Sequence, residues 1–164
     1  MSISASLLPE FEREMAGTRL TIERIPEDKL TWRPHPRSVA MGRLATHLVE
    51  LAGFAQRVIS DRSFDIGMDN SSRARELQSR VEILGQFDRN FAEAKVAIAA
   101  TPDREWMTPW TLTADGKIVF TLPRLAVMRN SVLNHTIHHR GQLTLYLRLN
   151  DVAVPGLYGP SADE

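Results

Sequence analysis

The clearest pattern along the chain is a spacing of apolar residues that alternates between three and four positions. Such spacing places side chains on one face of an α-helix and is typical of helices that pack against neighbours. Four segments of roughly 20 residues carry it, which predicts an all-α protein built as a four-helix bundle. Ser38 is the expected N-cap residue of the second helix. The four segments span residues 8–25, 44–58, 77–98 and 125–146.

One connection between the predicted helices favours β-structure. Two runs rich in β-branched and aromatic residues flank Asp115-Gly116, a pair that favours a two-residue hairpin turn. A small β-hairpin or an extended insertion is therefore expected before the last helix. The connection from Asp61 to Ser72 is polar, and we expect it to cross over the bundle. No repeat or linker interrupts the pattern, so residues 1–164 are expected to form a single domain.

The composition limits the kinds of binding and catalytic site that the chain can form. The 20 Lys and Arg residues balance the 20 Asp and Glu residues, so no net positive charge favours nucleic acid or an anionic membrane. No apolar run reaches the ~18 residues that a membrane helix needs, and the first residues lack a signal-peptide pattern, so we expect a cytoplasmic protein. The chain has no cysteine, which excludes thiolate metal sites and cysteine nucleophiles. Histidine, Asp and Glu remain as metal ligands or bases.

Histidines interrupt two of the apolar stripes. His47 lies between Leu44 and Leu51, and His135 and His139 share the stripe of the last helix. Residues four positions apart lie about 40° apart around a helix, so this pair can reach one point in space. Three unpaired imidazoles in a core would cost ~1–3 kcal/mol each, and a divalent metal removes that cost while leaving a fourth position open. Spacing alone leaves a second interpretation open, in which His47 is a hydrogen-bonded core histidine.

Three more residues are candidates for contact with a cofactor or cosubstrate. Glu50 follows His47 by three positions and is either a base or hydrogen-bond acceptor beside the metal, or an exposed acid. Gln142 lies on the inward stripe and is a candidate to orient a ligand. Tyr146, one turn further, either donates to a bound anion or packs in the core. Arg140 lies about 100° off the stripe, and we expect it to pair with an acid between helices.

Five other residues have roles that the sequence leaves open. His138 is offset from the stripe and His35 lies between two prolines, so both are expected outside the ligand set. Trp106, Trp110 and Phe120 either pack over the end of the bundle or form a lid on a substrate cleft.

Several motifs resemble those of the DinB-like family. Residues 134–142, which contain the pattern His-x-x-x-His-Arg-Gly-Gln, resemble the last-helix motif of that family. Residues 30–47 resemble its loop and second-helix motif, which ends in a ligand histidine. Residues 155–162 resemble the ending common in the family. The similarity covers nearly the whole chain, and its parts fall in the expected order.

The resemblance implies a metal centre and leaves the reaction open. His47, His135 and His139 would bind one divalent metal per chain, zinc or nickel first, although a three-His site also suits iron and copper. Known members include S-transferases that use low-molecular-weight thiols such as bacillithiol, and a mycothiol-dependent isomerase. A metal-dependent thiol S-transferase is therefore one hypothesis. The alternatives are a metal-dependent hydrolase and a non-catalytic homodimeric bundle that binds a metal or a small ligand. In each case the expected partners are a small molecule and a second copy of the chain.

Overall fold

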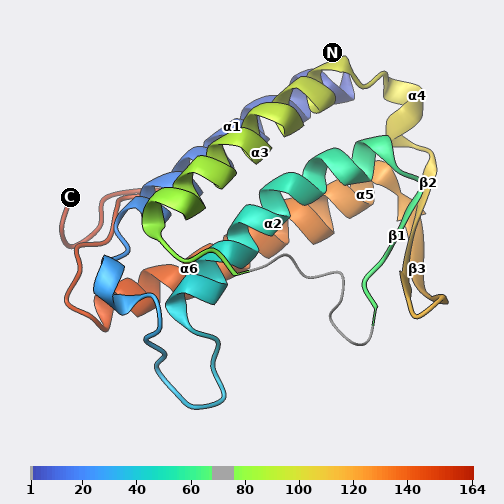
Figure 1. Ribbon diagram of the computed structural model, residues 1–164. Helices are drawn as coiled ribbons and strands as arrows, with labels where there is room; N and C mark the ends of the chain where they lie inside the picture. Colours follow the sequence, from blue (N-terminus) through green and yellow to red (C-terminus); the bar gives the residue numbers. More distant parts are fainter. Residues whose placement is uncertain (1, 68–75) are drawn as a thin grey trace.

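Four long helical elements dominate the computed structural model, which describes residues 2–67 and 76–164 (Figure 1). They match the four predicted segments, so the prediction of a helical bundle with an insertion before the last helix is confirmed. None of the helices within these ranges combines the length and apolar character that crossing a bilayer requires. The fourth element is an unbroken succession of α-, π- and α-helix. The bounds are Ile3–Glu23 (α1), Met41–Ser60 (α2), Arg80–Ala100 (α3), Arg124–Val127 (α5), Met128–Asn134 (η2, the π-helix) and His135–Arg148 (α6).

The long helices form a ring in which each packs against two others. α2 packs against α3 and α6, and α1 packs against the same two helices from the opposite side. In Figure 1, α2 and α3 run in the same direction. The crossover expected from Asp61 to Ser72 lies partly outside the described residues. Because α2 and α6 are neighbours, the histidines that they carry can meet.

The start of α2 differs from the prediction. Ala40, not Ser38, is the N-cap residue, and no side chain caps the helix. The backbone N–H groups of Met41 and Gly42 instead donate to carbonyl oxygens of the preceding loop, at 2.9 and 2.8 Å. A Cβ on Gly42 would lie only 3.1 Å from one of these oxygens, so the contact favours glycine. The loop thus caps α2 through its backbone.

A three-stranded sheet lies at the end of the bundle where α2 ends and α5 begins (Figure 1). The predicted hairpin is present: β2 (Pro109–Ala114) and β3 (Lys117–Pro123) pair antiparallel around Asp115 and Gly116. Both turn residues have positive φ, 48° and 73°, as tight hairpin turns require. β1 (Ser63–Asp65), which the sequence did not predict, pairs parallel with β2. A 3-10 turn and a short helix complete the described elements, η1 (Glu27–Lys29) and α4 (Asp103–Trp106).

One carboxylate, that of Asp65, joins β1 to the tip of the hairpin. It accepts hydrogen bonds from the N–H groups of Gly67, Asp115 and Gly116 at 2.8, 3.1 and 2.8 Å, and from the hydroxyl of Thr113 at 2.8 Å. The bonds from the Gly116 and Gly67 amides lower the pKa of this carboxyl to about 2. The charged form therefore holds the hairpin over a wide pH range.

The aromatic residues around the sheet pack over the end of the bundle. Trp106 and Trp110 are both 0% exposed. The indole N–H of Trp106 donates to the hydroxyl of Ser4 at 2.9 Å, and Phe120 lies against Trp110 with ring centroids 6.4 Å apart. Of the two roles left open for these residues, the geometry favours packing, because a lid would need side chains that can leave the core.

A buried ion pair joins α6 to α1 and to the C-terminal segment. Arg140 donates through Nη2 to Oε2 of Glu14 at 2.7 Å, and the two side chains are 3% and 4% exposed. The expectation that Arg140 pairs with an acid between helices is thus confirmed. The hydroxyl of Tyr158 donates to the same Oε2 at 2.6 Å. Burial raises the pKa of Glu14, but the hydrogen bonds from Tyr158 and Arg140 outweigh it and hold the pKa below its usual value.

We predict that Arg140→Met strongly destabilises the fold, because it leaves the Glu14 carboxylate buried without its partner. The expected loss in the free energy of unfolding is about 3–5 kcal/mol, measured by urea denaturation. Arg129→Met is the matched control, since it removes a pair with Glu10 between the same helical elements whose side chains are 49% and 34% exposed. That exposed pair is expected to contribute at most ~1 kcal/mol. Equal losses in the two variants would contradict the prediction.

Candidate metal centre

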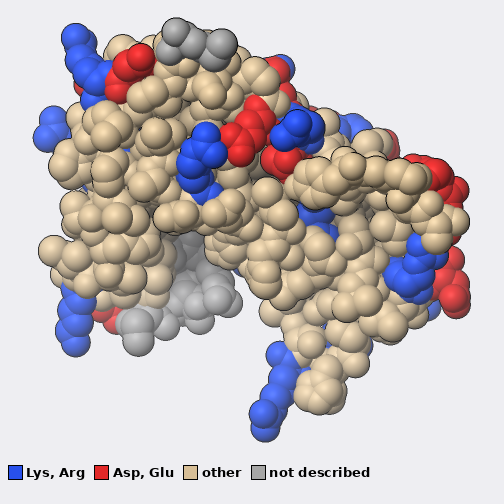
Figure 2. Space-filling model, turned by 180° about the vertical axis from the view of Figure 1, so that it is seen from behind, with Lys and Arg blue, Asp and Glu red and all other residues tan. Residues whose placement is uncertain are grey.

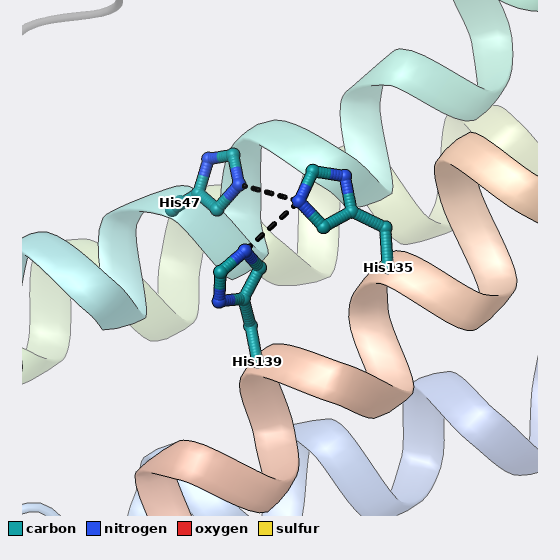
Figure 3. A group of neighbouring side chains, drawn as sticks. All are labelled: His47, His135 and His139. Carbon is teal, nitrogen blue, oxygen red and sulfur yellow. Dashed lines mark hydrogen bonds between the residues drawn. The ribbon is translucent and has the colours of Figure 1, made fainter.

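Three histidines from two neighbouring helices meet on one side of the bundle (Figure 3). His47 comes from α2, and His135 and His139 come from successive turns of α6. Nε2 of His135 lies 3.4 Å from Nε2 of His47 and 2.9 Å from Nε2 of His139. The three candidate ligand atoms all lie within 4.8 Å of one another. Nitrogen ligands at about 2.0–2.1 Å from a tetrahedral ion are themselves about 3.3 Å apart, so the spacing suits a divalent metal.

The outward nitrogen of His47 is fixed by a carboxylate. Nδ1 of His47 lies 2.9 Å from Oε2 of Glu50, and Arg43 donates to both oxygens of Glu50 at 2.9 and 2.8 Å. Burial raises the pKa of Glu50, but the hydrogen bonds from His47 and Arg43 outweigh it, so the net pKa is lowered. Because the ionised carboxylate can only accept, Nδ1 of His47 carries the proton and its Nε2 keeps a lone pair.

The other two rings have outward acceptors as well. Nδ1 of His139 lies 2.7 Å from Oε1 of Gln142, whose amide nitrogen lies 3.2 Å from Nε2 of His138. Gln142 is exposed, so the predicted inward position of its side chain is wrong. The backbone of Ser131 hydrogen-bonds to the ring of His135, whose Nε2 faces the cluster, so the bond uses the opposite nitrogen. All three rings thus favour the tautomer with the proton on Nδ1.

With all three rings in this tautomer, three lone pairs face one another across the short Nε2–Nε2 distances of the cluster. Acceptors left without a donor in a partly buried site cost ~1–3 kcal/mol each, and a cation at their centre satisfies all three. Burial, together with the neighbouring His139 and His47, lowers the pKa of His135 to about 4, and burial also lowers the pKa of His139. These imidazoles are neutral near pH 7, which is the state that binds a metal. The residues present fit a divalent ion.

The cluster opens onto a cavity of about 1110 Å³ between α2, α3, α6 and the sheet. Arg43 and Glu50 line it beside the histidines, while Phe54, Phe64 and Leu112 form an apolar wall towards the sheet. Three protein ligands leave at least one coordination position for a small molecule, as in catalytic metal sites. The cavity provides room for that molecule.

Three residues singled out from the sequence lie elsewhere. Tyr146 is 8% exposed and packs edge-on against Trp32, with ring centroids 5.6 Å apart. It does not line the cavity, so of the two roles left open for it the geometry favours packing in the core, and contact with a bound anion stays untested. His35 is exposed, and its Nδ1 accepts the N–H of Arg37 at 3.1 Å. His138 is also exposed and lies outside the cluster.

Sequence reasoning missed two residues that orient the cluster, Arg43 and Ser131. Each lies four positions before a cluster histidine, His47 and His135 respectively. Positions four apart share a helix face, so this spacing is the signal that would have found both.

The charged residues form no single basic stripe on the face shown in Figure 2. Lysine and arginine side chains are interspersed there with aspartate and glutamate, and uncharged residues cover most of the surface. A nucleic-acid interface gathers basic side chains on one face or along one helix. The described surface in this view has no such arrangement.

Comparisons with known proteins give one family. The model of the DinB superfamily matches residues 10–143. The chain is 24% identical over 161 residues to the uncharacterized protein YrdA of Bacillus subtilis (strain 168), with 96% of this chain and 89% of that protein covered. Its fold is similar to the crystal structure of a DinB-like protein from Bacillus cereus ATCC 10987, at a TM-score of 0.70 and 19% identity over 92% of this chain and 95% of that one. The DinB-like protein YjoA of Bacillus subtilis gives a TM-score of 0.72 at 14% identity, over 95% and 99% of the two chains.

We predict that the purified protein holds close to one divalent metal ion per chain, as measured by elemental analysis. His47→Ala removes one of three ligands and is expected to weaken binding at least ~100-fold, more than loss of an orienting residue would. His35→Ala is the matched control, since that ring is exposed and lies outside the cluster and the cavity. The prediction fails if His47→Ala binds metal as tightly as the control.

We also predict that the metal-free protein loses stability as the pH falls from 6.5 to about 4. In the folded state the pKa of His135 is lowered from 6.5 to about 4. Between these two pH values the unfolded chain therefore takes up a proton at His135 more readily than the folded one. This contribution is fully present above pH 6.5 and is lost as the pH falls through the folded value. Because the ring is only half-buried, the loss is on the order of 1–2 kcal/mol. Urea denaturation across this range should give a flatter pH dependence for His135→Asn, and parallel curves would refute the assignment.

Proposed function

Since the chain belongs to the DinB superfamily, we propose that it binds a divalent metal and activates a low-molecular-weight thiol for transfer to a small electrophile. The observation that carries the proposal is the convergence of three Nε2 lone pairs on the wall of a large cavity. A metal held there would lower the pKa of a bound thiol, so that thiolate is available near pH 7. The chain has no cysteine of its own, and the thiol therefore has to come from outside.

The surroundings of the cluster favour a thiol over water as the nucleophile. Water on a metal ion has a pKa near 7, and its attack is still aided by a protein group that takes up the proton. Glu50 is the carboxylate beside the cluster, but Arg43 donates to both of its oxygens and Nδ1 of His47 faces Oε2. A thiol is far more acidic than water and can release its proton to solvent without such a base. This contrast supports S-transfer rather than the hydrolase alternative.

The chain's own residues would orient the reaction partners. Glu50 and Gln142 hold the rings of His47 and His139 so that each Nε2 faces the cavity. In the proposed reaction the thiol proton passes to solvent, sulfur forms a bond to an electrophilic carbon, and the leaving group departs with the electron pair of the broken bond. The apolar wall that includes Phe54 would receive the carbon body of the electrophile.

Two further parts of the proposal concern the metal and the assembly. Zinc and nickel both suit three neutral imidazoles, and neither needs an oxygen ligand from the protein. A second copy of the chain would find apolar surface on the outer side of α6 and just beyond its end, where Leu145 and Leu149 are 57% and 55% exposed. Both features support a metal-loaded homodimer.

We predict that zinc- or nickel-loaded protein couples a low-molecular-weight thiol to 1-chloro-2,4-dinitrobenzene, with chloride as the leaving group. The aryl thioether is followed by its absorbance, with cysteine, glutathione, coenzyme A, bacillithiol and mycothiol as the thiols. His139→Ala is expected to lower kcat/KM roughly 100-fold or more, because it removes a ligand from the metal. His35→Ala should stay within about twofold of the original protein, because His35 lies outside the cluster and the cavity. Inactivity with every thiol in the fully metal-loaded protein would favour a non-catalytic binding protein.

A further inference from the structure

The cavity carries a cation at the end away from the histidines. Arg57 lies on α2 ten residues after His47, a rise of about 15 Å along the helix, and it is an exposed residue whose side chain lines the same cavity. Its guanidinium carbon lies 5.2 Å from the centroid of the Phe64 ring. Within residues 2–67 and 76–164, no carboxylate lies close enough to Arg57 to form an ion pair. Phe64 therefore positions this charge without neutralising it.

Several other polar side chains of the cavity wall have partners within the protein. Arg43 and Glu50 bind each other. Gln86 donates to the amide oxygen of Asn90 at 2.7 Å, and Asn90 donates to a backbone carbonyl at 2.8 Å. Thr46 donates to a backbone carbonyl of its own helix at 2.9 Å. The groups left to recognise a ligand are the cluster of Nε2 atoms at one end and Arg57 at the other, together with the side chain of Gln56 and Nη1 of Arg43, which is buried without a hydrogen-bond partner.

The wall between these two ends is mostly apolar. Leu51 and Phe54 line it from α2, and Phe64 and Leu112 line it from the sheet. A ligand that fills the cavity therefore needs a group that binds metal, an apolar middle and a group that complements a guanidinium. The residues of α2 that would meet these requirements follow one another along the helix, from His47 through Leu51 and Phe54 to Arg57.

We propose that Arg57 binds the carboxylate of a ligand whose other end reaches the three histidines. A guanidinium offers two parallel N–H donors that match a carboxylate, and its single positive charge balances a single negative one. This deepens the proposed function: the thiol, or the electrophile that it attacks, is a monocarboxylate with an apolar body. Only the part of the inference that concerns the metal-binding end of the ligand rests on the proposed function.

The test compares 8-mercaptooctanoate with 8-mercaptooctanol, which have the same length and differ in the terminal charge. Zinc-loaded protein is expected to bind the carboxylate roughly tenfold more tightly or better by calorimetry, and Arg57→Gln should remove this preference. Arg57→Lys should keep part of it. Arg62→Gln is the matched control, because Arg62 is exposed like Arg57 but does not line the cavity. For 3-mercaptopropionate against 3-mercaptopropanol, which are too short to span the cavity, no dependence on Arg57 is expected.

A second arm separates this inference from thiol activation. Metal-free protein is titrated with octanoate and 1-octanol, which carry no thiol, and the preference for octanoate should again depend on Arg57. If thiols fail to bind the metal while this preference persists, the proposed function fails and the carboxylate site stands. Equal binding of octanoate and octanol, or a preference that survives in Arg57→Gln with unchanged circular dichroism and metal content, would overturn the carboxylate site.

Discussion

The cluster of histidines depends on the hydrogen bond that each ring makes on its outward side. Glu50, Gln142 and the backbone of Ser131 fix the protons of the three rings on Nδ1, so the inward nitrogens have only lone pairs to offer one another. A cation satisfies all three nitrogens of that arrangement at once. Because His47 lies on α2 and the other two lie on α6, a bound metal would also link two neighbouring helices. Metal binding and the stability of the bundle are then coupled through the same atoms.

The position of α6 is set by what lies on its other sides. Arg140 follows His139 directly and so lies about 100° around the helix, where it meets Glu14 of α1. The π-helix η2 ends immediately before His135, and the N–H of His135 donates to the carbonyl of Val132 rather than to that of Ser131. The carbonyl that a regular α-helix would use for this bond can thus accept from the His135 ring. π-helical turns are rare and occur frequently at functional sites, and here the turn orients a candidate ligand.

Helical periodicity was sufficient to predict the four long helices and to bring His135 and His139 to one point, because both depend only on rotation per residue. The pairing of β1 with β2 joins segments more than 40 residues apart and has no local signal, so it could not be predicted. The prediction that the side chain of Gln142 points inward was wrong for a related reason. A stripe gives a direction around a helix axis but does not show how far a neighbouring helix extends over it. The π-helix and the contact between Arg57 and Phe64 were missed because neither has a local signal in the sequence.

The balance of charge around the cluster bears on which ligand it would accept. Three neutral imidazoles leave the full charge of a divalent ion uncompensated, and the nearby carboxylate of Glu50 is already paired with Arg43. The negative charge that balances the site therefore has to come from the bound molecule, which favours an anionic sulfur over a neutral ligand. Arg57 adds a second positive charge at the far end of the same cavity. Two arginines, Arg43 and Arg57, and two acids, Glu50 and Glu82, line this cavity, so the protein groups of the wall carry no net charge. The excess positive charge that would attract a small anionic ligand would therefore come from the bound metal.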